Sequence, residues 1–154
     1  MFGRLAGWMR ILGFDSAYPD IPDNMLVEFS LKEGRLLVTG DTGLNTAALK
    51  QGAACLYLEE RDIRKQISLL HAGGYLEGEA TGSSYCPLCN CFLRVTPGEE
   101  IKGRIPEYVF RTAATFHVCP DCGHVYWEGT HILGFRELID RILNNKSGGT
   151  AVGP

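Results

Sequence analysis

Two pairs of cysteines carry the strongest chemical signal in the sequence. Cys86 and Cys89 form one Cys-x-x-Cys pair, and Cys119 and Cys122 form a second pair beyond residues 90–118. Two intervening residues allow one tight turn to aim both sulfurs at a common point, and four thiolates satisfy the tetrahedral preference of Zn²⁺. The pattern predicts a structural zinc site of the zinc-ribbon type, because a longer loop between the pairs costs little closure entropy.

Other uses of these cysteines stay open. Redox dithiols or disulfides are the main alternative. The opening residues do not resemble a secretion signal, and in a reducing cytoplasm paired cysteines hold metal more often than they form disulfides. Cys91, His117 and His124 are rival ligands beside the pairs. Cys55 lies in an apolar segment and is interpreted as a small buried side chain.

Three aspartates lie where a divalent metal could be held. Asp41 follows the apolar segment 36–38, and Asp20 and Asp23 open the preceding helical segment. Sites in parallel sheets form at the carboxyl ends of the strands, and clustered carboxylates bind Mg²⁺ or Mn²⁺, which can activate water for phosphodiester cleavage. The alternative is structural, because aspartate commonly caps a helix and Asp41 before Thr42 fits that role.

An alternation of helical and strand patterns must position these side chains. Helical spacing of apolar residues predicts helices over 4–12, 20–34, 42–51 and 61–71. Continuous apolar runs predict strands over 36–38 and 53–58 that are covered on both faces, with a weaker strand candidate at 16–18. This order predicts an α/β fold with a parallel sheet and crossover helices.

The chain is expected to divide into two domains. The α/β domain covers residues 1–75, and a Gly/Ser-rich linker at 76–84 leads to the zinc ribbon at 85–131. A closing helix at 132–144 and a flexible tail at 145–154 follow.

Composition places the chain among ordinary globular proteins. Its 154 residues are 45% hydrophobic and 21% charged, which disfavours a disordered chain or a coiled coil. The formal net charge of −3 means that no overall basic field indicates a nucleic-acid partner. No apolar run approaches the ~18 residues of a membrane-spanning helix, so we expect a cytoplasmic protein without a membrane partner.

Four segments, taken together, are similar to those of a known family. They are residues 3–15, 34–41, 86–90 and 119–131. Their order resembles the Mut-seven carboxy-terminal RNase domain family, in which a PIN-like nuclease fold carries a zinc ribbon. The resemblance implies metal-dependent RNA cleavage, with Asp41 and Asp23, and Asp20 as a further candidate, gathering Mg²⁺ or Mn²⁺.

The resemblance also implies a first strand that this sequence lacks. Family members usually begin with a strand ending in Asp-x-Met-Leu, whose aspartate is a metal ligand, and this sequence begins at the corresponding Met1. Gly7 and Gly40 replace common arginines, and Cys91 replaces a common glycine. The protein either starts upstream, which a larger native mass would reveal, or is a shortened and inactive relative. Without the strand, its neighbours would leave backbone amides and apolar side chains uncovered.

Arg4 and Arg10 are the candidate RNA contacts, with Trp8 nearby. Arginine pairs with phosphate and an aromatic ring stacks on a base, although Trp8 fits core packing and both arginines fit a solvated helix face. Residues 85–131 carry no excess of positive charge, so the ribbon is not expected to attract the phosphates of RNA electrostatically. The competing interpretation is a non-catalytic module that binds RNA or a protein partner, through the zinc ribbon or an exposed sheet edge.

Overall fold

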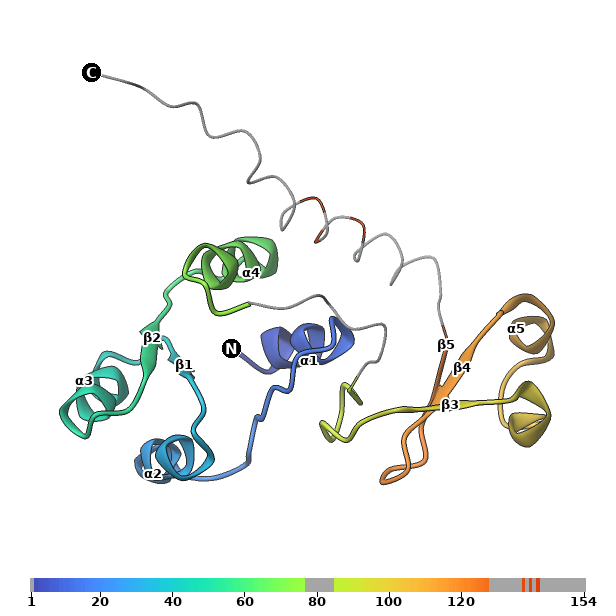
Figure 1. The fold of residues 1–154 in the computed structure, drawn as a ribbon, viewed down its shortest axis with the longest axis horizontal. Coiled ribbons are helices and arrows are strands. Elements are labelled where there is room, and N and C mark those ends of the chain that lie inside the picture. Colours follow the sequence, from blue (N-terminus) through green and yellow to red (C-terminus); the bar gives the residue numbers. More distant parts are fainter. Residues whose placement is uncertain (1, 77–84, 128–136, 138, 140, 142–154) are drawn as a thin grey trace, which may run out of the picture.

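The computed structural model describes residues 2–76 and 85–127, together with residues 137, 139 and 141. Its strands fall into an amino-terminal parallel pair and a carboxyl-terminal antiparallel group of three (Figure 1). The predicted fold class, an α/β region followed by a cysteine-bearing ribbon, is therefore confirmed. The predicted linker, most of the closing helix and the tail lie outside the described residues.

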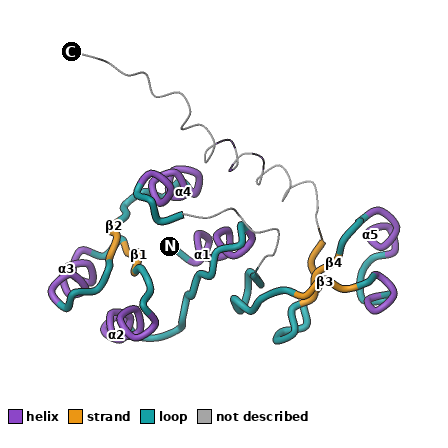
Figure 2. The backbone as a smooth tube through the Cα atoms, viewed as in Figure 1, coloured by secondary structure: helices purple, strands orange, loops and turns teal. Residues whose placement is uncertain are grey.

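The amino-terminal region alternates helices and strands. In chain order the elements are α1 (Gly3–Ile11), α2 (Asp23–Glu33), β1 (Leu37–Thr39), α3 (Thr42–Lys50), β2 (Cys55–Tyr57) and α4 (Ile63–Ala72). β1 and β2 are parallel, with Val38 opposite Leu56, and α3 is the crossover between them. Helices surround this pair, as Figure 2 shows. None of the described helices is long and apolar enough to cross a membrane.

The main core forms where α1 packs near α4. Leu5 and Met9 of α1 and Leu12, which caps its carboxyl end, lie at helical spacing and are 4–5% exposed, and Ile67 and Leu70 of α4 are also buried. This is the stripe that the apolar periodicity predicts for both helices.

The parallel strands are less buried than predicted. Leu37, Val38 and Leu56 are half-buried, whereas their apolar runs predict strands covered on both faces. The reason lies in the topology: among the described residues β1 pairs with β2 alone, so one edge of each strand is open. The strand predicted at 16–18 is also absent, because that segment joins neither sheet.

The carboxyl-terminal region is a three-stranded antiparallel sheet. Its strands are β3 (Arg94–Thr96), β4 (Phe116–Val118) and β5 (Val125–Trp127), with β4 in the middle. Between β3 and β4 the chain forms a 3-10 helix, Gly98–Ile101, and α5 (Glu107–Thr112). Ile101 and Val109 from this insertion pack on Phe116 and Val118. The long spacer between the cysteine pairs thus supplies a small core of its own.

Candidate functional site

The four cysteines of the predicted metal site come together from two turns. Cys86 and Cys89 precede β3, and Cys119 and Cys122 lie between β4 and β5. All four sulfur atoms lie within 4.8 Å of one another. Cys86 Sγ is 3.6 Å from Cys122 Sγ, and Cys89 Sγ is 3.4 Å from Cys119 Sγ. Tetrahedral Zn²⁺ with bonds of about 2.3 Å needs sulfur separations of about 3.8 Å, so the cluster fits one such ion.

Both cysteine turns have the same backbone conformation. The N–H of Asn90 donates to the C=O of Cys86 at 2.9 Å, and the N–H of Gly123 donates to the C=O of Cys119 at 3.0 Å. Asn90 and Gly123 each follow the second cysteine of a pair and have φ values of 64° and 73°. Glycine adopts this left-handed conformation freely, and asparagine tolerates it better than most residues.

The buried cysteines are prepared to act as thiolates. Cys86 is 0% and Cys119 is 1% exposed. Burial raises the pKa of Cys86, but the hydroxyl of Tyr126, 3.1 Å away, and neighbouring backbone amides outweigh burial and lower this pKa to about 6. At Cys119 burial again opposes ionisation, and backbone amides again lower the pKa. Metal ligation by cysteine requires the thiolate, so this environment favours binding.

The rival ligands lie outside the cluster. Within the described parts of the chain, the four cysteines are the one group of three or more ligands close enough to share an ion, and Cys91, His117 and His124 do not belong to it. The sulfur separations are also far above the 2.05 Å of a disulfide. Cys55 lies in β2 and is half-buried, and burial raises the pKa of its thiol.

Arg10 joins the first cysteine turn to α1. Its side chain is 6% exposed, and the guanidinium donates to the backbone oxygens of Ser16 at 2.8 Å, Pro87 at 2.6 Å and Leu88 at 3.2 Å. Tyr85 returns a bond from its N–H to the C=O of Arg10. A guanidinium buried in this way is not presented to a phosphate, so we replace the RNA contact predicted for Arg10 with a structural role.

A second set of contacts runs from the same turn to β1. Asn90 accepts from the N–H of Ser16 at 3.1 Å and donates to Asp15 at 2.5 Å. Asp15 in turn pairs with Arg35, just before β1, at 2.8 Å. The hydrogen bond from Arg35 is the main reason that the pKa of Asp15 lies below its ordinary value. These contacts connect the first cysteine turn to the amino end of the parallel strands.

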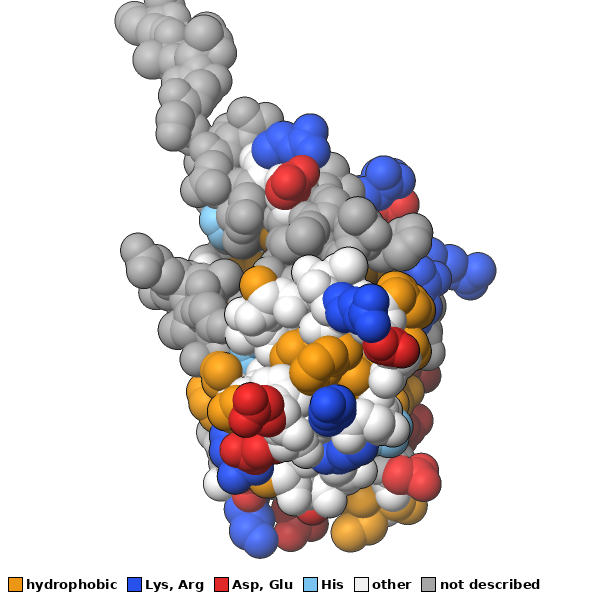
Figure 3. Space-filling model, turned by 90° about the vertical axis from the view of Figure 1, so that its right-hand side faces the viewer, with side chains coloured by type: hydrophobic (Ala, Val, Ile, Leu, Met, Phe, Trp, Pro, Cys, Tyr) orange, Lys and Arg blue, Asp and Glu red, His pale blue; other side chains and the backbone are white. Residues whose placement is uncertain are grey.

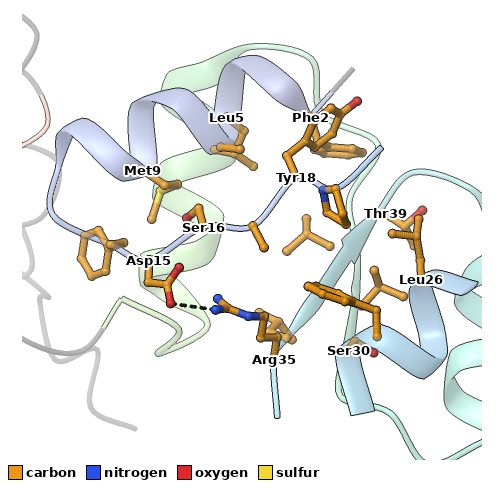
Figure 4. Close-up of a pocket in the computed structure, with 18 of the residues that line it drawn as sticks. Phe2, Leu5, Met9, Asp15, Ser16, Tyr18, Leu26, Ser30, Arg35 and Thr39 are labelled. Carbon is orange, nitrogen blue, oxygen red and sulfur yellow. Dashed lines mark hydrogen bonds and ion pairs between the residues drawn. The ribbon is translucent and has the colours of Figure 1, made fainter. Parts of the chain in front are cut away.

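The three predicted catalytic aspartates line one cavity. It has a volume of about 670 Å³ and lies between α1, the segment 14–21, α2 and β1 (Figure 4). Asp23 is the first residue of α2, Asp20 lies in the segment just before it, and Asp41 lies beyond the carboxyl end of β1. All three are exposed. In the described residues they do not form a close group of three ligands, so they differ from the cysteines.

Asp41 is also a helix cap. Its Oδ1 accepts from the N–H of Leu44 at 2.6 Å, and its own N–H donates to Thr39 Oγ1 at 3.0 Å. These bonds fix the carboxylate at the start of α3 and leave Oδ2 without a hydrogen bond from the described residues. The structural alternative for Asp41, a helix cap, is therefore confirmed.

A family comparison assigns the chain. The family model for the Mut7-C RNAse domain matches residues 1–139. The chain belongs to the Mut7-C RNAse domain family. No curated protein and no solved structure matches it. Because the match covers both cysteine turns and all three aspartates of the cavity, the Mut7-C assignment supports a nuclease-like role and RNA as the substrate class.

The sequence of this Mut7-C domain does not predict the side-chain contacts between its two regions. Asp15, Arg35 and Asn90 link the two regions, and none was predicted as a contact. One signal was present: Asn90 occupies the place after the first cysteine pair that Gly123 occupies after the second, which indicates a left-handed residue. The packing interpretation of Trp8 is confirmed, because the ring is half-buried against the main core. Arg4 is exposed on α1.

Proposed function

We propose that the protein is a ribonuclease that depends on a divalent metal and works at the acidic end of the 670 Å³ cavity. The observation that carries this proposal is that Asp20, Asp23 and Asp41 line one cavity at the carboxyl end of a parallel strand in a chain of the Mut7-C RNAse domain family. Their carboxylate oxygens are the donors that Mg²⁺ and Mn²⁺ prefer. When bound, such an ion supplies the Lewis acidity that phosphodiester hydrolysis needs.

The chain's own residues have distinct parts in this proposal. Asp41 presents one carboxylate oxygen, and its capping bond to Leu44 keeps the group from rotating. Asp23 presents its carboxylate from the first residue of α2, and Asp20 presents its own from the segment before that helix. Arg4 is the remaining candidate for a phosphate contact, because it is exposed on α1, three of whose residues line the cavity. The proposal assigns no phosphate contact to Arg10.

A pair of matched variants tests the cleavage. Asp41→Asn removes the negative charge but keeps the cap, because asparagine caps a helix as well as aspartate. Asp62→Asn makes the same change at the cap of α4, where Asp62 accepts from Arg64 and Lys65 and does not line the cavity. With labelled single-stranded RNA and added Mn²⁺, we expect about a 100-fold loss of cleavage rate for Asp41→Asn and less than a twofold loss for Asp62→Asn.

Two outcomes of that assay contradict the proposal. One is cleavage by the unaltered chain that does not depend on added Mn²⁺ or Mg²⁺. The other is an equal loss of rate in both variants, which would mean that the loss came from helix capping and not from the cavity. Binding of RNA without cleavage would favour a non-catalytic module instead.

We further propose that the cysteine cluster holds a structural Zn²⁺. Four thiolates at tetrahedral separations suit Zn²⁺ or iron, and a site closed by four protein ligands has no open position for substrate. Elemental analysis of the purified chain should give one zinc per molecule and no iron. A content of less than half an equivalent, or a visible iron–thiolate absorption, would contradict this assignment.

One observation favours a docking role for the ribbon beside the nuclease role. Val95 and Tyr108 are apolar side chains that are 64% and 71% exposed. Figure 3 shows the side of the molecule that lies at the right of Figure 1, where basic and acidic side chains are interspersed around apolar ones. A mixed surface of this kind suits a protein partner better than a phosphate backbone. Loss of partner binding without loss of cleavage in Tyr108→Ser would support it.

A further inference from the structure

The two cysteine turns share one backbone conformation but differ in one residue that this conformation does not explain. Gly123 follows the second cysteine pair with a φ of 73°, and Asn90 follows the first pair with a φ of 64°. Glycine fits the left-handed region better than asparagine does, so the backbone alone gives no reason for an asparagine. Its side chain gives one, because the amide group bonds to Ser16 and Asp15, which are 74 and 75 residues away in the sequence.

The backbone of Ser16 is held from two sides. Its N–H donates to Asn90 Oδ1 at 3.1 Å, and its C=O accepts from Arg10 Nε at 2.8 Å. Residues 14–20 belong to no helix or strand, so the segment depends on bonds of this kind for a fixed position. Asp20 lies further along the same segment and lines the cavity. The first cysteine turn therefore helps to place the wall of the cavity that carries Asp20.

The same turn reaches the wall formed by β1 through Asp15. Asn90 donates to Asp15, and Asp15 pairs with Arg35 at 2.8 Å, as the dashed line in Figure 4 shows. Arg35 precedes β1, and Asp41 follows the other end of that strand. A hydrogen-bonded strand moves as a unit, so a displacement of Arg35 is carried along β1. One anchor thus acts on both walls and on the separation of Asp20 and Asp41.

The position of the first cysteine turn depends on what joins its sulfur atoms. Between Cys86 and Cys91 every side chain is exposed or half-buried, and Leu88 is 62% exposed. Burial of apolar surface therefore does little to hold this turn. A metal ion shared with the second cysteine pair holds it instead, because each metal–sulfur bond fixes one end of the turn. Loss of the ion frees the turn, and with it the contacts to Ser16 and Asp15.

We propose that the metal state of the cysteine cluster regulates the acidic site. With metal bound, the first cysteine turn keeps the two walls at the separation that Asp20 and Asp41 need to share a divalent cation. Without metal, the walls move independently and the acidic site holds a cation less tightly. Asn90 is a positioning residue in this link, because it acts through Ser16 and Asp15 and not on the cation itself. The inference rests on the proposed nuclease function, since it concerns the same acidic site.

Amide exchange of the full chain tests the link without RNA. When Cys86→Ser with Cys119→Ser removes the metal, we expect the N–H of Ser16 to exchange about tenfold faster or more. The N–H of Ala53, which donates to the C=O of Ala48 near the end of α3, is the internal control and should stay within about twofold. An unchanged exchange rate at Ser16 would overturn the proposal.

Binding of Mn²⁺ alone tests the effect on the acidic site. Electron paramagnetic resonance measures free Mn²⁺, and the part of the binding that Asp41→Asn removes belongs to this site. Asn90→Gly keeps the conformation of the turn and its zinc but removes the link, so the Mn²⁺ dissociation constant should rise about fivefold. Arg104→Ala removes a bond inside the ribbon, to the C=O of Gly123 at 2.6 Å, and should leave this constant within about 1.5-fold.

The outcomes separate this inference from the proposed function. Equal Mn²⁺ binding by the unaltered chain and by Asn90→Gly, with zinc retained in both, would overturn the regulation and leave the nuclease proposal standing. It would mean that Asn90 contributes to stability alone. Absence of any Mn²⁺ binding that depends on Asp41 would contradict the nuclease proposal and the regulation with it. A weaker Mn²⁺ site in Asn90→Gly but not in Arg104→Ala would support both.

Discussion

The cysteine cluster and the aspartate cavity show two ways in which a chain can present metal ligands. The four cysteines lie within 4.8 Å of one another, and backbone amides lower the pKa of the two buried ones, Cys86 and Cys119, with further help from Tyr126 at Cys86. The three aspartates are exposed, line a larger space, and at least one of them is already used as a helix cap. The first site is assembled by the fold, whereas the second offers donors that an ion or substrate has still to gather.

The largest expected effect is loss of the ribbon when its metal ligands are removed. Cys86→Ser with Cys119→Ser should abolish metal binding and unfold β3–β5, because a structural zinc site contributes about 10–16 kcal/mol. Metal content and amide exchange of the ribbon are the measurements. Cys91→Ser is the control and should change neither, since Cys91 lies outside the cluster. If the amides of the ribbon stayed protected from exchange in the metal-free double variant, the view that the fold of the ribbon depends on its metal would be contradicted.

The next effect concerns the connection between the two regions. Arg10→Ala should lower the free energy of unfolding by about 3 kcal/mol, because three backbone oxygens lose a charged donor. Arg4→Ala, on an exposed position of the same helix, should change it by no more than about 0.5 kcal/mol. Urea unfolding followed by circular dichroism measures both. Similar values for the two variants would show that the regions are independent.

Variants of Asn90 distinguish the cost of backbone strain from the cost of lost side-chain hydrogen bonds. Asn90→Gly keeps the left-handed conformation and loses the bonds to Ser16 and Asp15, at about 1–2 kcal/mol. Asn90→Ala loses the same bonds and adds about 1–2 kcal/mol of strain. Gly123→Ala, at φ 73°, should show the strain alone. If alanine were tolerated as well as glycine at residue 90, the two cysteine turns would not share one conformation.

The smallest expected effect is the pH dependence that the Asp15–Arg35 pair gives to the free energy of unfolding. The folded-state pKa of Asp15 is lowered, chiefly by Arg35, so its contribution to stability is complete above the unfolded value of about 3.9 and is lost as the pH falls below it. Because the pair is partly exposed, we expect less than about 1 kcal/mol. Denaturant unfolding of Asp15→Asn between pH 5 and 3, roughly spanning that value, should show a shallower decline than the unaltered chain.

Local patterns in the sequence were sufficient for most elements of the α/β region. The helix predicted at 4–12 is α1, and the one predicted at 42–51 is α3, because apolar spacing, caps and glycine stops act within a few residues. Gly34, predicted to end α2, takes the left-handed C-cap. The strand at 16–18 failed, since a strand exists only when a distant partner pairs with it.

The sequence by itself identified the four cysteines that come together in the fold, because a Cys-x-x-Cys turn is formed by adjacent residues whatever surrounds it. It also placed Asp41 at the end of a strand and the start of a helix. Only the tertiary structure showed that the Arg10 guanidinium binds the first cysteine turn instead of facing a phosphate, because its three acceptors are backbone oxygens of Ser16, Pro87 and Leu88. The same holds for the cavity beside β1, whose walls come from helices and a strand that meet only after folding.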